Sequence, residues 1–135
     1  MKYMKILEMK IKPVLSSLSS SDFLDLVRQC EFSKKTEFNV FFVLEEMLAN
    51  IMKYSNCTLD ISLKLLIYES FIEMYLSDNG VKFDPLKRQD PDIESCPLAK
   101  PEGGLGIYLS KRKTDEMIYR REGDYNILKM VLKLN

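Results

Sequence analysis

The sequence predicts an α+β fold: a two-layer α/β sandwich whose mixed, mostly antiparallel sheet is covered on one face by helices. Apolar residues alternate with period two in two paired stretches, residues 58–80 and 115–135, as is typical of antiparallel hairpins. Three other stretches have helical spacing of their apolar residues. A chain of 135 residues with 46% hydrophobic content can close one core. We therefore expect a single domain, residues 1–135.

The N-terminal part of the chain predicts one strand followed by one helix. Residues 3–11 alternate apolar and charged side chains, and Pro13 ends the strand that they form. A serine cluster, residues 16–21, then leads into residues 22–30, and one of its last three serines is expected to cap a helix there. One face of this helix carries Phe23, Leu26, Val27 and Cys30.

Residues 36–54 form the clearest predicted helix. Its expected buried stripe consists of Phe38, Phe41, Phe42, Leu48 and Met52. A second, mostly polar face carries Asn39, Val43, Glu46, Asn50 and Lys53. We expect the three phenylalanines to lie in the core.

The first hairpin is expected to bury alternate residues of two strands, and a long loop follows it. The alternating residues are Leu59, Ile61, Leu63, Leu65 and Ile67, then Ile72, Met74 and Leu76. Residues 81–102 contain four prolines and few apolar side chains, which is typical of a functional lid.

The C-terminal part of the chain predicts a helix and a second hairpin. Glycines 103, 104 and 106 open the helix, and the hairpin turns near Gly123 and Asp124. In its last strand, one face carries Leu128, Met130, Leu132 and Leu134.

Composition excludes several classes of function. Twenty basic and twenty acidic residues cancel, which argues against a dedicated nucleic-acid binder. The chain has no histidine and no closely spaced cysteine pair, which excludes a Cys/His zinc site and a histidine general base. No apolar stretch is long enough to span a membrane or to act as a signal peptide. We expect a cytoplasmic protein that binds neither a membrane nor nucleic acid directly.

Glu46 and Asn50 form the first motif that carries chemistry. Their four-residue spacing places a carboxylate and an amide on one face of the long helix. An amide oxygen suits Mg²⁺, and a carboxylate can orient or deprotonate a hydroxyl. An isolated pair of this kind is more often solvated surface.

Asp78-Asn79-Gly80 forms the second motif, at the end of a predicted strand. An aspartate there can accept a hydrogen bond from an exocyclic amine, and a glycine lets a flat ring approach the backbone. An ordinary turn is the alternative. Phe83-Asp84-Pro85, three residues further on, makes a chance match less common.

The third motif is Gly103-Gly104-Leu105-Gly106, directly before a helix. Free N–H groups at a helix N-terminus suit phosphate oxygens, and a flexible hinge is the alternative. Neither a dinucleotide-binding fingerprint nor a P-loop surrounds these glycines.

Together and in this order, the three motifs resemble the ATP-binding fold of the histidine-kinase, Hsp90 and gyrase ATPase superfamily. Residues 43–54 and 103–123 are similar to the bacterial anti-sigma-factor serine/threonine kinases. The resemblance implies ATP and Mg²⁺ as ligands, with Glu46 as catalytic base and Asn50 as the residue that holds Mg²⁺. It also implies nucleotide-binding roles for Asp78, Gly80, Gly104, Leu105, Gly106 and Asn126. Lys87, Arg88 and Lys100 of the lid are candidates for phosphate contacts.

The resemblance implies an ATP-binding anti-sigma regulatory factor with protein kinase activity. Its substrate would be a serine or threonine of a STAS-type anti-anti-sigma partner, and it would also bind a sigma factor. Since relatives are often homodimers, we expect a homodimer. The alternative is an ATP-dependent regulatory binding module without kinase activity, and a stand-alone ATPase is less favoured. Glu46 favours the kinase.

Overall fold

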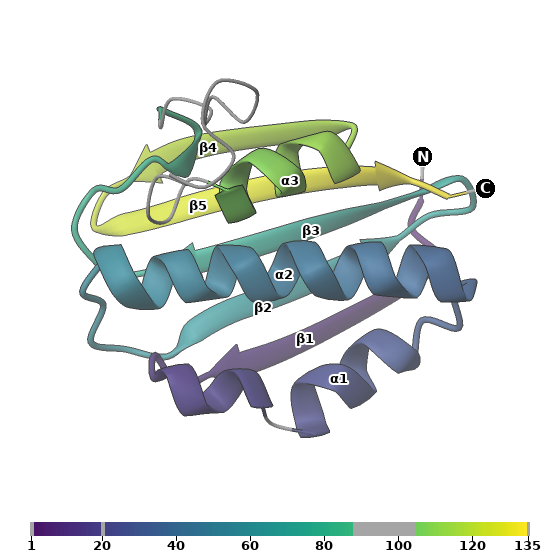
Figure 1. Ribbon diagram of the computed structural model, residues 1–135, viewed down its shortest axis with the longest axis horizontal. Helices are drawn as coiled ribbons and strands as arrows, with labels where there is room; N and C mark the ends of the chain where they lie inside the picture. The colour runs from purple at the N-terminus through teal and green to yellow at the C-terminus, as the bar shows by residue number, and fades with distance from the viewer. Residues whose placement is uncertain (1, 20, 88–104, 135) are drawn as a thin grey trace.

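A computed structural model of the chain describes residues 2–19, 21–87 and 105–134 as an antiparallel sheet with helices on one face (Figure 1). The strands are β1 (Lys5–Ile11), β2 (Ile61–Ile67), β3 (Phe71–Asp78), β4 (Glu116–Glu122) and β5 (Tyr125–Lys133). The α-helices are α1 (Ser21–Arg28), α2 (Lys34–Tyr54) and α3 (Leu105–Lys113). Two 3-10 helices, η1 (Leu15–Ser19) and η2 (Pro85–Lys87), complete the described elements.

The sheet has the strand order β1-β2-β3-β5-β4, and every pairing between these strands is antiparallel. This confirms the predicted α+β class. β5 lies between β3 and β4, so the two hairpins join in the middle of the sheet. The second hairpin turns at Gly123 and Asp124 as predicted, because Glu122 pairs with Tyr125. Gly123 has φ 56°, a left-handed conformation that glycine adopts without steric cost.

Alternate residues of the strands and one face of α2 form the core. The sheet contributes Ile61, Leu63 and Leu65 from β2, Ile72, Met74 and Leu76 from β3, and Leu128, Met130 and Leu132 from β5. From α2 come Val40, Val43, Leu44, Met47, Leu48 and Ile51. Ser33 caps α2, since its side chain accepts a hydrogen bond from the Thr36 backbone N–H. The long helix is thereby fixed across the middle of the sheet (Figure 1).

Two predicted core residues are exposed. Phe38 is 60% exposed, because the face of α2 that packs on the sheet begins at Val40. Its ring stacks on Phe42, and the Lys113 ammonium lies 5.2 Å from the centre of each ring. Phe41 and Phe42 are half-buried against the core. Leu59 is 57% exposed, because it precedes the first residue of β2.

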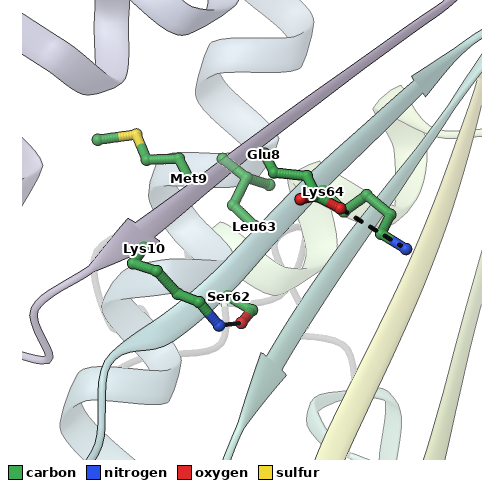
Figure 2. Close-up of a pocket in the computed structure, with 6 residues that line it drawn as sticks. All are labelled: Glu8, Met9, Lys10, Ser62, Leu63 and Lys64. Carbon is green, nitrogen blue, oxygen red and sulfur yellow. Dashed lines mark hydrogen bonds and ion pairs between the residues drawn. The ribbon is translucent and has the colours of Figure 1, made fainter.

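The other face of the sheet carries no helix from the described part of the chain (Figure 1). Along β1 and β2, Lys10 donates a hydrogen bond to Ser62 and Glu8 lies 3.9 Å from Lys64 (Figure 2). An exposed ion pair of this kind contributes little to stability.

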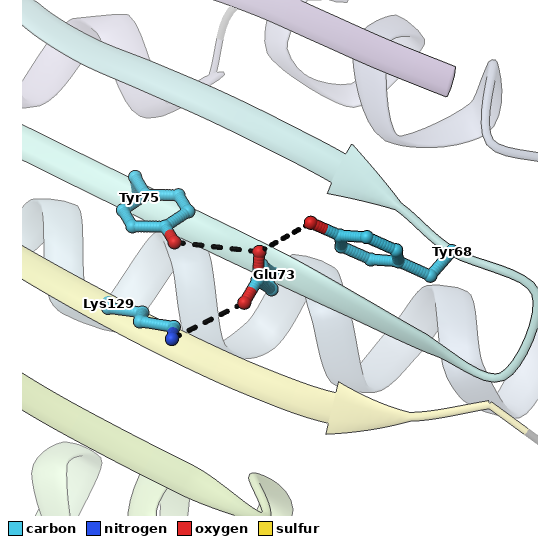
Figure 3. Close-up of polar contacts among 4 residues, drawn as sticks. All are labelled: Tyr68, Glu73, Tyr75 and Lys129. Carbon is cyan, nitrogen blue, oxygen red and sulfur yellow. Dashed lines mark hydrogen bonds and ion pairs between the residues drawn. The ribbon is translucent and has the colours of Figure 1, made fainter. Parts of the chain in front are cut away.

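Further along this face, Glu73 is the centre of a polar cluster (Figure 3). Its carboxylate accepts hydrogen bonds from the hydroxyls of Tyr68 and Tyr75, at 3.0 and 3.5 Å, and pairs with Lys129 at 3.3 Å. Cross-strand contacts of this kind add modestly to the stability of the pairing between β3 and β5. None of the helices described is long and apolar enough to cross a membrane.

Candidate functional site

Residues of the first two sequence motifs meet at one end of the sheet, between α2 and the ends of β3 and β5. A small cavity there is lined by Asn50 from α2, Asp78 from β3 and Asn126 from β5. Phe83 and Pro85, which follow β3, close it. The structure therefore brings together three side chains that are far apart in the sequence, Asn50, Asp78 and Asn126.

Asp78 is the last residue of β3 and is 2% exposed. Its Oδ1 atom accepts hydrogen bonds from the Gly80 backbone N–H at 2.9 Å and from the Asn126 side-chain amide at 3.0 Å. Within residues 21–87 and 105–134, no hydrogen bond engages the other oxygen, Oδ2. A carboxylate held in this way can accept a hydrogen bond from an amine on a ligand in the cavity.

Asn50 is buried on α2, one turn after Glu46. Its Nδ2 atom donates to the Glu46 backbone carbonyl at 2.8 Å. This contact fixes the amide, so that the oxygen Oδ1 is the atom left to face the cavity. An amide oxygen is a suitable ligand for Mg²⁺, which proteins hold with few side chains and substrate phosphates. The residue therefore fits the role of a magnesium ligand. Within the described ranges, no group of three or more Cys, Asp or Glu side chains could hold a metal alone.

The side chain of Glu46, which belongs to α2, lies against the start of α3. A Cβ atom added to Gly106 would lie 2.9 Å from the carboxyl carbon of Glu46, and nearer still to its Oε2. The pKa of Glu46 is raised above its ordinary value, first by burial and then by Glu45, whereas Lys53 lowers it. Burial and the Glu45 charge therefore make Glu46 a stronger proton acceptor. The first motif and the start of α3 are thus in direct contact.

Gly80 is fixed by close packing against the C-terminal cap of α2. A Cβ atom added to Gly80 would lie 2.6 Å from the hydroxyl oxygen and 2.7 Å from the carbonyl carbon of Ser55. The Ser55 carbonyl also accepts a hydrogen bond from the Val81 backbone N–H at 2.7 Å. Asn79 lies between Asp78 and Gly80, and its side-chain oxygen accepts hydrogen bonds from the backbone N–H groups of Thr58 and Leu59. The turn after β3 is therefore anchored to both ends of the α2–β2 connection.

The cavity is small in this conformation. Its volume is about 10 Å³, which is roughly the room that one water molecule needs. Ligand sites for small molecules are usually at least thirty times larger, about 300 Å³ or more. The Phe83 ring packs on Tyr54, with ring centres 5.3 Å apart, and Pro85 is buried. The cavity in this conformation is too small for a ligand of the size of a nucleotide base.

Some predicted site residues lie outside the described ranges. Gly104 is among them, as are Arg88 and Lys100 of the expected lid. Leu105 and Gly106 form the first turn of α3, whose leading backbone N–H groups have no partner within the helix. Lys87 is exposed at the end of η2.

Sequence reasoning missed two residues beside the site. No role was predicted for Arg121, but its Nη1 atom donates to the Gly80 carbonyl at 2.7 Å and to Asn126 Oδ1 at 3.2 Å. The Tyr119 hydroxyl donates to the same Asn126 oxygen. The signal was available in part, because residues 117, 119 and 121 alternate onto the same face as Asn126 once the hairpin turns at Gly123.

Comparisons with known proteins agree with the fold and with the family that the sequence resembles. The chain is 27% identical over 126 residues to the serine-protein kinase RsbW of Listeria monocytogenes serotype 4a (strain HCC23), covering 87% of this chain and 80% of that protein. RsbW of L. monocytogenes serovar 1/2a (strain ATCC BAA-679 / EGD-e) is 26% identical over 125 residues. The structure of the Acinetobacter baumannii histidine kinase AdeS matches with a TM-score of 0.53 and 13% identity, over 98% of this chain and 70% of that one. A family model described as a histidine kinase-like ATPase domain matches residues 20–132. The chain belongs to the histidine kinase-like ATPase domain family.

Proposed function

We propose that the protein is an ATP-dependent serine/threonine protein kinase that phosphorylates a STAS-type anti-anti-sigma partner and also binds a sigma factor. The observation that carries the proposal is the position of Glu46: a carboxylate with a raised pKa, one helical turn from Asn50 and in contact with the start of α3. The relatives named serine-protein kinase support the same activity. Cytoplasmic location remains a prediction from the sequence, and a homodimer remains a prediction from the resemblance.

The chain's own residues supply binding and positioning. Asp78 presents Oδ2 to the exocyclic amine of adenine, while Oδ1 is held by Gly80 and Asn126. The unpaired N–H groups of the first turn of α3, at Leu105 and Gly106, suit phosphate oxygens. Asn50 would hold Mg²⁺ through its Oδ1 atom, and the bound metal would supply neutralisation of charge on the phosphates.

Glu46 then acts on the second substrate. Its carboxylate accepts the proton of the serine or threonine hydroxyl as the hydroxyl oxygen bonds to the γ-phosphorus and the bond to ADP breaks. The raised pKa makes the Glu46 carboxylate a stronger base. Phosphoryl transfer needs mainly alignment and charge neutralisation, which these groups provide.

The test replaces the proposed base, Glu46, and uses a variant at a second carboxylate of α2 as the control. Glu46→Gln keeps the size and polarity of the side chain but cannot accept the proton. We expect ATP binding by calorimetry to persist and phosphate transfer from labelled ATP to a STAS-domain partner to fall by about two to four orders of magnitude. Glu37→Gln changes another carboxylate of α2, which pairs with Arg28 and is not among the groups that shift the pKa of Glu46, so transfer should stay within about twofold of the wild type.

Three outcomes separate the alternatives. Transfer by Glu46→Gln at the wild-type rate would show that Glu46 is not the base. A wild-type protein that binds ATP but phosphorylates no STAS partner would be a nucleotide-dependent binding module. Absence of ATP binding by nucleotide-stripped wild-type protein would contradict both functions.

A further inference from the structure

The ends of β3, β5 and β4 place three polar side chains in one row. Asp78 on β3 is the register partner of Asn126 on β5, and Asn126 is the register partner of Arg121 on β4. The row runs from the cavity side of Asp78 to the edge strand. The middle residue, Asn126, is 4% exposed, so its hydrogen bonds must come from the protein around it.

Asn126 uses all the hydrogen-bonding capacity of its side chain. Its Nδ2 atom donates to Asp78 Oδ1 at 3.0 Å and to the Val81 carbonyl at 2.8 Å. Its Oδ1 atom accepts from Arg121 Nη1 at 3.2 Å, from the Phe83 backbone N–H at 3.2 Å and from the Tyr119 hydroxyl. A primary amide has two N–H donors, and both are engaged. Asn126 therefore has no donor left for a nucleotide.

Only one orientation of this amide is compatible with its neighbours. Arg121 and the Phe83 N–H can only donate, and the Val81 carbonyl can only accept. A flipped amide would place its N–H groups against two donors and its oxygen against two acceptors. Arg121 also donates to the Gly80 carbonyl, which ties the turn after Asp78 to the same guanidinium.

This orientation determines what Asp78 offers to a ligand. Because the Asn126 amide and the Gly80 N–H both donate to Oδ1, the carboxylate is held in one orientation, and Oδ2 is the atom that can face the cavity. Oδ2 is then an acceptor. An acceptor suits the exocyclic amine of adenine and repels the carbonyl oxygen that guanine has in the same position.

We propose that Arg121, assisted by Tyr119, is a positioning residue for base selection: it fixes the Asn126 amide, which keeps Asp78 an acceptor that selects adenine over guanine. The inference rests on the proposed binding of adenine at Asp78. It assigns a part in nucleotide specificity to Arg121 of β4, a residue that does not itself line the cavity.

The first experiment changes Arg121 and compares ATP with GTP by calorimetry. In Arg121→Ala the amide oxygen loses the one charged donor among its three, and Asn126 holds Asp78 less firmly. We expect the preference for ATP over GTP to fall by about tenfold, the usual scale for a lost hydrogen bond to a charged group. Arg121→Lys restores a cationic donor and should recover most of the preference. Arg120→Ala is the matched control: Arg120 is exposed and contacts Glu122, and its removal should leave the preference unchanged.

The second experiment uses pH. Asn126→Asp keeps the side-chain shape but places a carboxylate oxygen where Nδ2 faces Asp78 and the Val81 carbonyl, so a proton is needed between the two acids. The other titratable groups around the pair are Arg121 and Tyr119, with Asp84 and Cys57 nearby. We expect ATP affinity of this variant to be about tenfold or more lower at pH 8 than at pH 6, while the wild type stays nearly constant.

The outcomes decide the inference separately from the proposed function. Wild-type protein that does not bind ATP would overturn the proposed function. If the wild type binds ATP, an unchanged preference for ATP over GTP in a folded Arg121→Ala variant overturns the inference alone. Should that variant fail to fold, Tyr119→Phe decides, because it removes the other side-chain donor to the same Asn126 oxygen: an unchanged preference overturns the inference, and a reduced preference supports it. A flat pH profile of Asn126→Asp would show that Asn126 does not hold Asp78, which also overturns the inference.

Discussion

Gly80→Ala should destabilise the protein by a steric clash at the C-terminal end of α2. Gly80 has no left-handed φ, so alanine could adopt its backbone conformation. The added Cβ would lie 2.6 Å from the hydroxyl oxygen and 2.7 Å from the carbonyl carbon of Ser55. The second of these atoms is backbone, at the cap of a 21-residue helix, and it cannot move alone.

The size of the effect follows from three contributions. Overpacking costs about 1–3 kcal/mol. Displacing the Ser55 carbonyl weakens its hydrogen bond from the Val81 N–H, which is worth about 0.5–1.5 kcal/mol. The smaller unfolded-state entropy of alanine offsets about 0.4–1 kcal/mol of this loss. The free energy of unfolding should fall by about 0.5–4 kcal/mol, and 2 kcal/mol, near the middle of this range, would lower the melting temperature by roughly 5–10 °C.

Urea unfolding of wild type, Gly80→Ala and Gly123→Ala measures the difference. Gly123→Ala is the control, because a Cβ there meets no atom within 4 Å and its cost, about 1–2 kcal/mol, comes from φ alone. Ser55→Gly removes the hydroxyl but leaves the carbonyl, so it should rescue Gly80→Ala in part and leave Gly123→Ala unchanged. Unfolding of Gly80→Ala at the wild-type midpoint, or no coupling to Ser55, would refute the steric argument.

Two further predictions concern Glu46. In Gly106→Ala the new Cβ meets the flexible end of Glu46, so the carboxylate should swing away: stability should change by less than about 1 kcal/mol, while phosphate transfer falls as it does in Glu46→Gln. Equal transfer by Gly106→Ala and wild type would contradict the contact. Because folding raises the pKa of Glu46, the folded state binds a proton on this carboxyl more tightly than the unfolded state does. The ionised form of Glu46 therefore lowers the free energy of unfolding at pH values above the folded-state pKa. Glu46→Gln should therefore melt at a higher temperature than wild type near pH 7, with the difference vanishing below about pH 4, whereas a constant difference across this range would exclude a raised pKa.

Local patterns in the sequence predicted the order of the elements and the fold class. Period-two alternation located β2, β3 and β5, and the turn at Gly123 and Asp124 was expected from its glycine. Helical spacing located α2 within two residues of its start. These features depend on neighbours at most a few residues apart, so composition and period are sufficient to indicate them.

The same patterns were insufficient to determine which side chains face the core and the site. The aromatic stripe of α2 predicted Phe38 inside, but the sheet covers the face that begins at Val40. Hydrophobicity alone does not fix the rotation of a helix when apolar residues extend around more than half of it.

The sequence by itself determined the elements, their order and the helical spacing of Glu46 and Asn50. Only the tertiary structure decided that Glu46 meets Gly106, that Gly80 packs on Ser55 and that Arg121 holds Asn126 against Asp78. Glu46 and Gly106 are sixty residues apart, and Asp78 and Asn126 forty-eight. Contacts at such separations depend on strand register and helix placement, which arise from packing of the whole core and leave no periodic signal in the chain.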